Sequence, residues 1–78
     1  MVKISPNPSN GDLKLYVNGA ISDNYNIEVY NLVGNIVYSK KGLHGGVASI
    51  DLTQLGKGVY IISVGNEKVS SRQRVVLK

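Results

Sequence analysis

The sequence predicts an all-β fold, an antiparallel sandwich of seven short strands. Apolar and polar residues alternate with a period of two in many short stretches, which is typical of half-buried strands. Glycine, asparagine and proline interrupt the alternation about every 8–12 residues, a spacing typical of β-sandwiches. No stretch follows the 3.6-residue period of a helix. With 78 residues, 42% of them hydrophobic, we expect one domain spanning residues 1–78.

The alternation justifies the strands in order. The first strand is short because Pro6 and Pro8 follow it. The second carries leucine or valine at every other position from Leu13, and the third repeats this pattern from Tyr25. The fourth returns as the hairpin partner of the third, the fifth and sixth follow glycine-rich stretches, and the seventh is the longest. The expected strands are residues 2–4, 12–17, 25–31, 36–40, 47–52, 59–64 and about 68–77.

The connections carry recognisable turn residues. Asn7 and Pro8 suit the first two positions of a type I turn, and Gly11 can supply a positive φ. Gly34 in "NLVGN" is expected to take a left-handed conformation in a short hairpin. Residues 42–46, "GLHGG", are expected to form the next turn, and residues 18–24 form a loop.

The segment "LTQLGKGVYIISV", residues 52–64, predicts a corner between the two sheets. In immunoglobulin-like and fibronectin-like sandwiches, a tyrosine at the start of the strand after this crossover donates its hydroxyl to the backbone upstream. Tyr60 fits that role, with Gly56 and Gly58 allowing a tight backbone. The alternative is that Tyr60 is an ordinary half-buried strand aromatic. The corner and the strand count together favour a seven-stranded immunoglobulin-like or fibronectin-like sandwich.

The residues give no sign of catalysis, metal or cofactor. The chain has no cysteine, and its one histidine, His44, lies in a glycine-rich turn without a nearby carboxylate. The five carboxylates stand singly, without the spacing of a metal or acid–base pair. "GKG", residues 56–58, lacks the frame of a phosphate loop. We therefore expect a protein that is not an enzyme.

The ends of the chain suggest a fragment of a longer secreted precursor. No apolar run approaches the ~18 residues of a membrane span, and no signal-peptide core is present. Met1 is followed at once by strand-like sequence, which favours an excised domain.

The last strand, "KVSSRQRVVLK", concentrates positive charge in a chain whose net charge is +4. In a regular strand Lys68, Arg72, Arg74 and Lys78 share one face, a stripe about 33 Å long. One interpretation is a solvated face that discourages edge-to-edge pairing. Another is a docking stripe for an acidic receptor or an anionic glycolipid. Nucleic-acid binding is less favoured, because no aromatic residues interleave with the cations.

Four motifs in order resemble the type A C-terminal sorting domain of the type IX secretion system, across nearly the whole chain. They are the opening "PNP" motif (Pro6, Asn7, Pro8, Gly11), the "vyN..G" hairpin (Tyr30, Asn31, Gly34), the "L..G.Y" segment (Leu55, Gly58, Tyr60), and a closing basic-aliphatic run from Arg74 to Lys78. Two positions depart from the family pattern: Ser5 stands where tyrosine is frequent, and Arg74 where lysine is usual.

The resemblance implies a non-catalytic secretion signal behind an N-terminal cargo domain. The cargo would fold in the periplasm, and the signal would be recognised by the outer-membrane translocon and a shuttle protein. A sortase would then remove the signal, often attaching the cargo to the cell surface. We expect a monomer that docks by strand addition and charge through Lys68, Arg72, Arg74, Val75, Val76, Leu77 and Lys78. The alternatives are an immunoglobulin-like carbohydrate-binding or adhesion module and a structural spacer.

Overall fold

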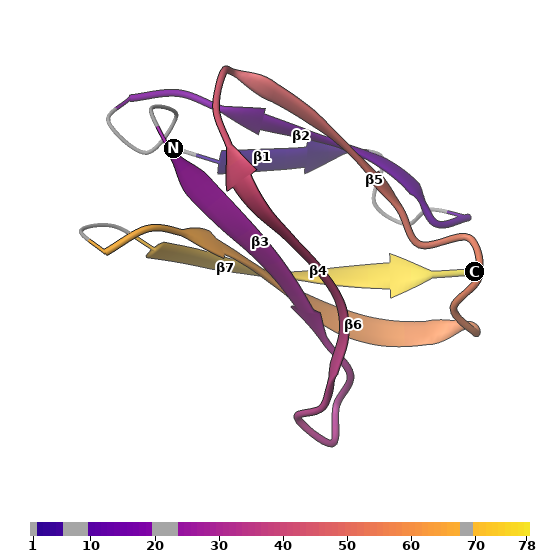
Figure 1. Cartoon of the computed structure of the whole chain (residues 1–78). Coiled ribbons are helices and arrows are strands. Elements are labelled where there is room, and N and C mark those ends of the chain that lie inside the picture. The colour runs from indigo at the N-terminus through magenta and orange to yellow at the C-terminus, as the bar shows by residue number, and fades with distance from the viewer. Residues whose placement is uncertain (1, 6–9, 20–23, 68–69) are drawn as a thin grey trace.

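The computed structural model describes residues 2–5, 10–19, 24–67 and 70–78, and in these ranges it forms seven strands in two layers (Figure 1). A three-stranded sheet has the order β1-β2-β5, and a four-stranded sheet has the order β4-β3-β6-β7. Every neighbouring pair is antiparallel. The strands are β1 (Val2–Ser5), β2 (Asp12–Val17), β3 (Tyr25–Tyr30), β4 (Ile36–Leu43), β5 (Val47–Asp51), β6 (Gly58–Gly65) and β7 (Ser70–Leu77).

All seven expected strands are present, and the largest error lies at the end of β4. The strand continues to Leu43, so the expectation of a turn beginning at Gly42 was wrong. Lys41 and Gly42 both lie opposite Asn26, which makes a β-bulge. The Gly42 amide donates to Asn26 Oδ1 at 3.1 Å. The bulge therefore lets β4 continue through Gly42, and the strand ends at Leu43.

The core lies between the sheets and is built from the alternating residues of both. Its apolar members come from all the strands except β4, together with Leu52 just after β5. Phenylalanine and tryptophan are absent from the chain, so Tyr25 supplies the largest fully buried side chain, at 1% exposure. Its hydroxyl donates to the Gly45 carbonyl at 3.3 Å, and burial raises the pKa of Tyr25.

One side-chain contact joins the outer strands of the two sheets. Gln73 on β7 donates from Nε2 to the carbonyl of Val2 on β1 at 2.6 Å. The amide thereby donates to a backbone acceptor on the edge strand of the opposite sheet. This contact holds β7 in position against the first strand.

The Asp51 side chain should make the free energy of unfolding depend on pH in the acidic range. Its Oδ1 accepts from the Thr53 amide at 3.0 Å and the Thr53 hydroxyl at 2.6 Å, and these bonds lower the pKa of Asp51 from its ordinary value of 3.8. Because the folded pKa is the lower one, this stabilisation is present above pH 3.8 and is lost as the pH falls through the folded value. In Asp51→Asn the fall in urea midpoint at acidic pH should be shallower.

Candidate docking face

The glycine of the opening motif, Gly11, lies where two connections cross. Its φ is +108°, and an added Cβ would come within 2.7 Å of the Leu52 carbonyl carbon. The Gly11 carbonyl also accepts from the Leu52 amide at 2.7 Å. This motif position therefore holds the chain before β2 against the crossover that follows β5. Pro6, Asn7 and Pro8 of the same motif lie outside the described residues.

The hairpin motif forms a rigid turn between β3 and β4. Asn31 Oδ1 accepts from the amides of Val33 (3.1 Å) and Asn35 (3.0 Å). The Gly34 amide donates to the Asn31 carbonyl at 3.0 Å, and Gly34 has φ +98°. The left-handed conformation predicted for Gly34 is thus confirmed, and the Asn31 side chain fixes the turn from inside.

The third motif forms the predicted corner. The Tyr60 hydroxyl donates to the Gly56 carbonyl at 2.8 Å, and its ring packs against the core. The Leu55 amide donates to the Leu52 carbonyl at 3.0 Å, and the Leu55 side chain also packs on the core. Gly58 begins β6, and a Cβ placed there would lie 3.9 Å from the Tyr60 ring. The motif therefore holds the crossover between the two sheets.

Tyr60→Phe tests the corner. Loss of the hydrogen bond to Gly56 should lower the free energy of unfolding by about 0.5–1.5 kcal/mol, while the ring keeps its packing. Chemical denaturation measures the change. Tyr16→Phe on β2, where the side chain is 43% exposed, is the control and should change stability by less than about 0.5 kcal/mol. An equal loss in both variants would contradict a specific role for the corner.

The terminal strand divides its side chains between core and surface. Arg72, Arg74 and Lys78 are exposed, and Val76 is half-buried. Among the residues expected to contact a receptor, Val75 (0% exposed) and Leu77 (4%) belong to the core. In the folded domain these two side chains stabilise the sandwich and leave little surface for a partner. Lys68, the remaining cation of the expected stripe, lies outside the described residues.

The outward faces of β3, β6 and β7 form one surface, which we call the docking face. Strand register places its side chains in three rows: Glu28, Ser63 and Arg72; Tyr30, Ile61 and Arg74; and Val59 and Val76. The inward neighbours on the same strands, such as Val29, Ile62 and Val75, are fully buried. The docking face thus combines cations with aliphatic side chains.

The sequence did not lead us to predict the apolar side chains of the docking face. No function was predicted from the sequence for Val59 or Ile61, which lie on the outward side of β6. The nearly continuous apolar run "VYIISV", residues 59–64, was the available signal, since such runs are typical of strands that are covered on both faces.

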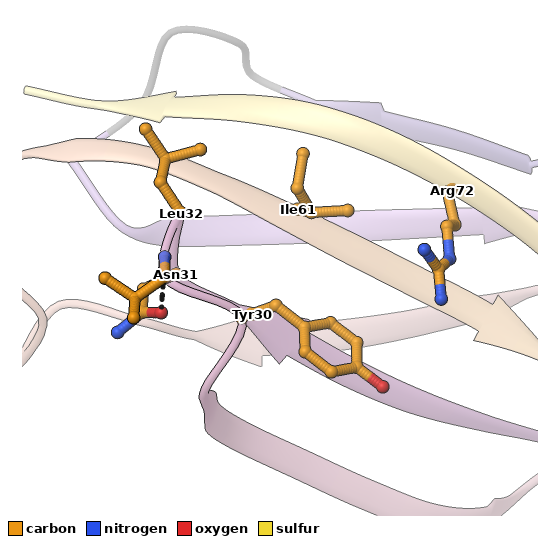
Figure 2. A pocket seen from close by; sticks show the side chains of 7 residues that line it. Tyr30, Asn31, Leu32, Ile61 and Arg72 are labelled. Atoms are coloured by element: carbon orange, nitrogen blue, oxygen red, sulfur yellow. Dashed lines mark hydrogen bonds between the residues drawn. The ribbon is translucent and has the colours of Figure 1, made fainter.

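A hollow of about 360 Å³ lies between the hairpin turn and the docking face. Figure 2 shows Tyr30, Ile61 and Arg72 around it, with Leu32 on the turn. The Tyr30 hydroxyl donates to Glu28 Oε1 at 2.9 Å, and the Arg72 guanidinium carbon lies 5.8 Å from the centre of the Tyr30 ring. The hydrogen bond to Glu28, more than burial, raises the pKa of Tyr30. The tyrosine stays protonated and holds its ring beneath the arginine.

The hairpin presents apolar side chains to solvent. Leu32 is 71% exposed, Val33 84% and Ile36 53%. The turn itself is held by Asn31 and Gly34, so these aliphatic side chains contribute little to its geometry. Adjacent exposed aliphatic residues on a rigid turn, next to a hollow, indicate a surface that contacts another molecule.

The part of the chain described by the structure holds no cluster of three or more histidine or carboxylate side chains able to bind a metal. Over the same residues, no helix has the length and apolarity needed to span a membrane. The docking face combines exposed arginine side chains with aliphatic side chains. A mixed surface of this kind, beside a hollow and an exposed apolar turn, is typical of a recognition module, a domain that another molecule recognises.

Comparison with known families identifies the module. The family described as the secretion system C-terminal sorting domain matches residues 3–78. The chain belongs to this family and is a C-terminal sorting signal of type IX secretion. A comparison with curated proteins found no match. The family match does not favour the alternative of a carbohydrate-binding or adhesion module.

Membership fixes the general setting of the domain. A sorting signal of this kind implies an N-terminal cargo and the type IX machinery, and it directs that cargo to the cell surface or the medium. Members of the family are in general not catalytic.

Proposed function

We propose that the type IX translocon or its shuttle protein recognises the folded domain through its docking face. In this proposal Arg72, Arg74 and Lys78 contact an acidic surface of the partner. One observation carries this proposal: Gly11, Asn31 and Tyr60 of the motifs hold the fold together, whereas the cations of β7 share one outer surface with the aliphatic side chains of β6 and β7. Charge complementarity steers such encounters and selects the partner.

The strand order supports the finer fold assignment. An immunoglobulin constant-type domain divides its seven strands between the sheets ABED and CFG. Here the fourth strand pairs with β3 instead, which leaves sheets of three and four strands. With the tyrosine corner at the same crossover, this arrangement supports an immunoglobulin-like or fibronectin-like sandwich formed by residues 1–78 as a single domain.

The placement of the ends suits a signal carried behind a cargo. β1 begins at one end of the molecule and Lys78 lies at the opposite end (Figure 1). A cargo joined before β1 would therefore leave the last residues accessible. In this proposal the domain is a monomer that crosses the periplasm folded, contributes no catalytic group, and is removed by a sortase that cuts before the opening motif.

A reporter fusion tests the function. Residues 1–78 are placed behind a signal peptide and a stable reporter in a bacterium with a type IX system. The fusion should reach the surface or the medium, and should stay in the periplasm of a strain that lacks the translocon. A reporter that stays periplasmic in the competent strain would show that the domain is a spacer.

A further inference from the structure

The hollow beside the hairpin has a chemical character of its own. Seven residues line it: Tyr30, Asn31, Leu32, Val33, Gly34, Ile61 and Arg72. Arg72 is the charged member of this set, and Leu32, Val33 and Ile61 are aliphatic. One cation beside an apolar wall matches a ligand that carries a carboxylate next to an apolar group.

The arginine is held ready for such a ligand. Its guanidinium lies over the ring of Tyr30, which Glu28 anchors by a hydrogen bond. The contact with the ring leaves the N–H donors of the guanidinium able to bind a carboxylate in bidentate fashion. Holding the side chain in place beforehand reduces the entropy lost on binding.

The hairpin supplies the opposite wall. Asn31 and Gly34 fix the turn, so Leu32 and Val33 stand at defined positions at the rim of the hollow. Figure 1 shows the turn between β3 and β4 projecting beyond the rest of the sandwich. A partner can therefore reach these two side chains without contacting the cargo end.

From this geometry we infer that the hollow binds a segment of a partner protein in which an aspartate or glutamate lies beside an apolar side chain. The carboxylate pairs with Arg72, and the apolar side chain packs against Leu32, Val33 and Ile61. The charge of this surface favours an acidic partner, since Arg74 on β7 and Lys78 directly after the strand add exposed positive charge to that of Arg72. A glycolipid phosphate would match clustered cations better than one arginine beside aliphatic side chains. This inference rests on the proposed secretion function.

Variants of the exposed hairpin give the first test, in the reporter fusion used for export. Leu32→Ser with Val33→Ser should reduce export about fivefold or more and leave the thermal midpoint unchanged, because both side chains are exposed. Val47→Ser removes an aliphatic side chain of similar exposure (57%) from the other sheet and should export normally. If the unaltered fusion is not exported, the proposed function fails. If the double variant exports like the unaltered fusion, the hairpin inference alone fails.

Photo-crosslinking during export identifies the partner. A benzophenone amino acid at position 33 should crosslink to a protein segment that contains an acidic residue near an apolar one, whereas the same group at position 47 should not. Arg72→Glu should abolish the crosslink, and changing the partner's acidic residue to arginine should restore it. Crosslinks only to lipid, only to a second copy of this chain, or to a segment without a carboxylate would overturn the inference, as would failure of the charge swap.

Discussion

Replacing Gly11 with alanine should unfold most of the protein. At φ +108° an L-residue is strained, and the new Cβ would lie 2.7–2.8 Å from three backbone atoms of Leu52 and Thr53. Strain of this kind costs about 1–3 kcal/mol, and forcing backbone apart costs a further 1–3 kcal/mol or so. A domain of this size is stable by only about 3–5 kcal/mol. Urea denaturation followed by circular dichroism should show little or no folded baseline.

Gly34→Ala is the matched control for Gly11→Ala. Gly34 has nearly the same φ, +98°, but nothing lies within 4 Å of an added Cβ. Only the backbone strain remains, so the expected loss is about 1–3 kcal/mol, and more of the protein should stay folded than in Gly11→Ala. Equal losses in the two variants would show that the backbone contact with Leu52 and Thr53 is not the cause.

Reversing the charges of β7 should block export of a protein that still folds. Arg72→Glu with Arg74→Glu lowers the net charge from +4 to 0, since each reversal removes two charges. Both side chains are exposed, so the thermal midpoint should change little. Like charges placed against an acidic partner cost several kcal/mol. Secretion of the reporter fusion should therefore fall about tenfold or more.

The control for charge reversal uses the other sheet. Lys3→Glu with Lys14→Glu makes the same change in net charge at exposed positions of β1 and β2. Export of this variant should match that of the unaltered fusion. If both pairs reduce export equally, net charge matters and its position does not, which would contradict the docking face.

Truncating residues 74–78 is a weaker test of recognition. It removes Val75 and Leu77, which are 0% and 4% exposed and belong to the core. Burying two such side chains contributes about 1.5–3 kcal/mol each. Loss of export on truncation would therefore follow from unfolding alone, whereas charge reversal at exposed positions separates recognition from stability.

Most of the motif positions described above stabilise the fold and do not contact a partner in this proposal. Gly11 meets the crossover, Asn31 fixes the hairpin, and Tyr60 closes the corner. Variants at these positions should lose export because the folded surface is lost. The residues proposed to contact a partner are Arg72 and two members of the closing motif, Arg74 and Lys78, together with Leu32 and Val33, the variable positions of the hairpin motif.

Local pattern alone determined the strands and the corner of this protein. Alternation gave seven strands with ends mostly correct to one or two residues, because a strand with one buried face must repeat every second residue. Tyr60 was recognisable because its hydrogen-bond acceptor, Gly56, lies only four residues upstream. Interactions between nearby residues leave a signal in the sequence itself.

The tertiary structure decided which face is presented and what borders it. The hollow joins a turn near residue 32 to strands at residues 61 and 72, and strand pairing across the sheet alone brings these together. The same pairing places Val75 and Leu77 inward and Arg72 above Tyr30. Contacts between residues distant in the chain depend on register and sheet order, which no local period encodes.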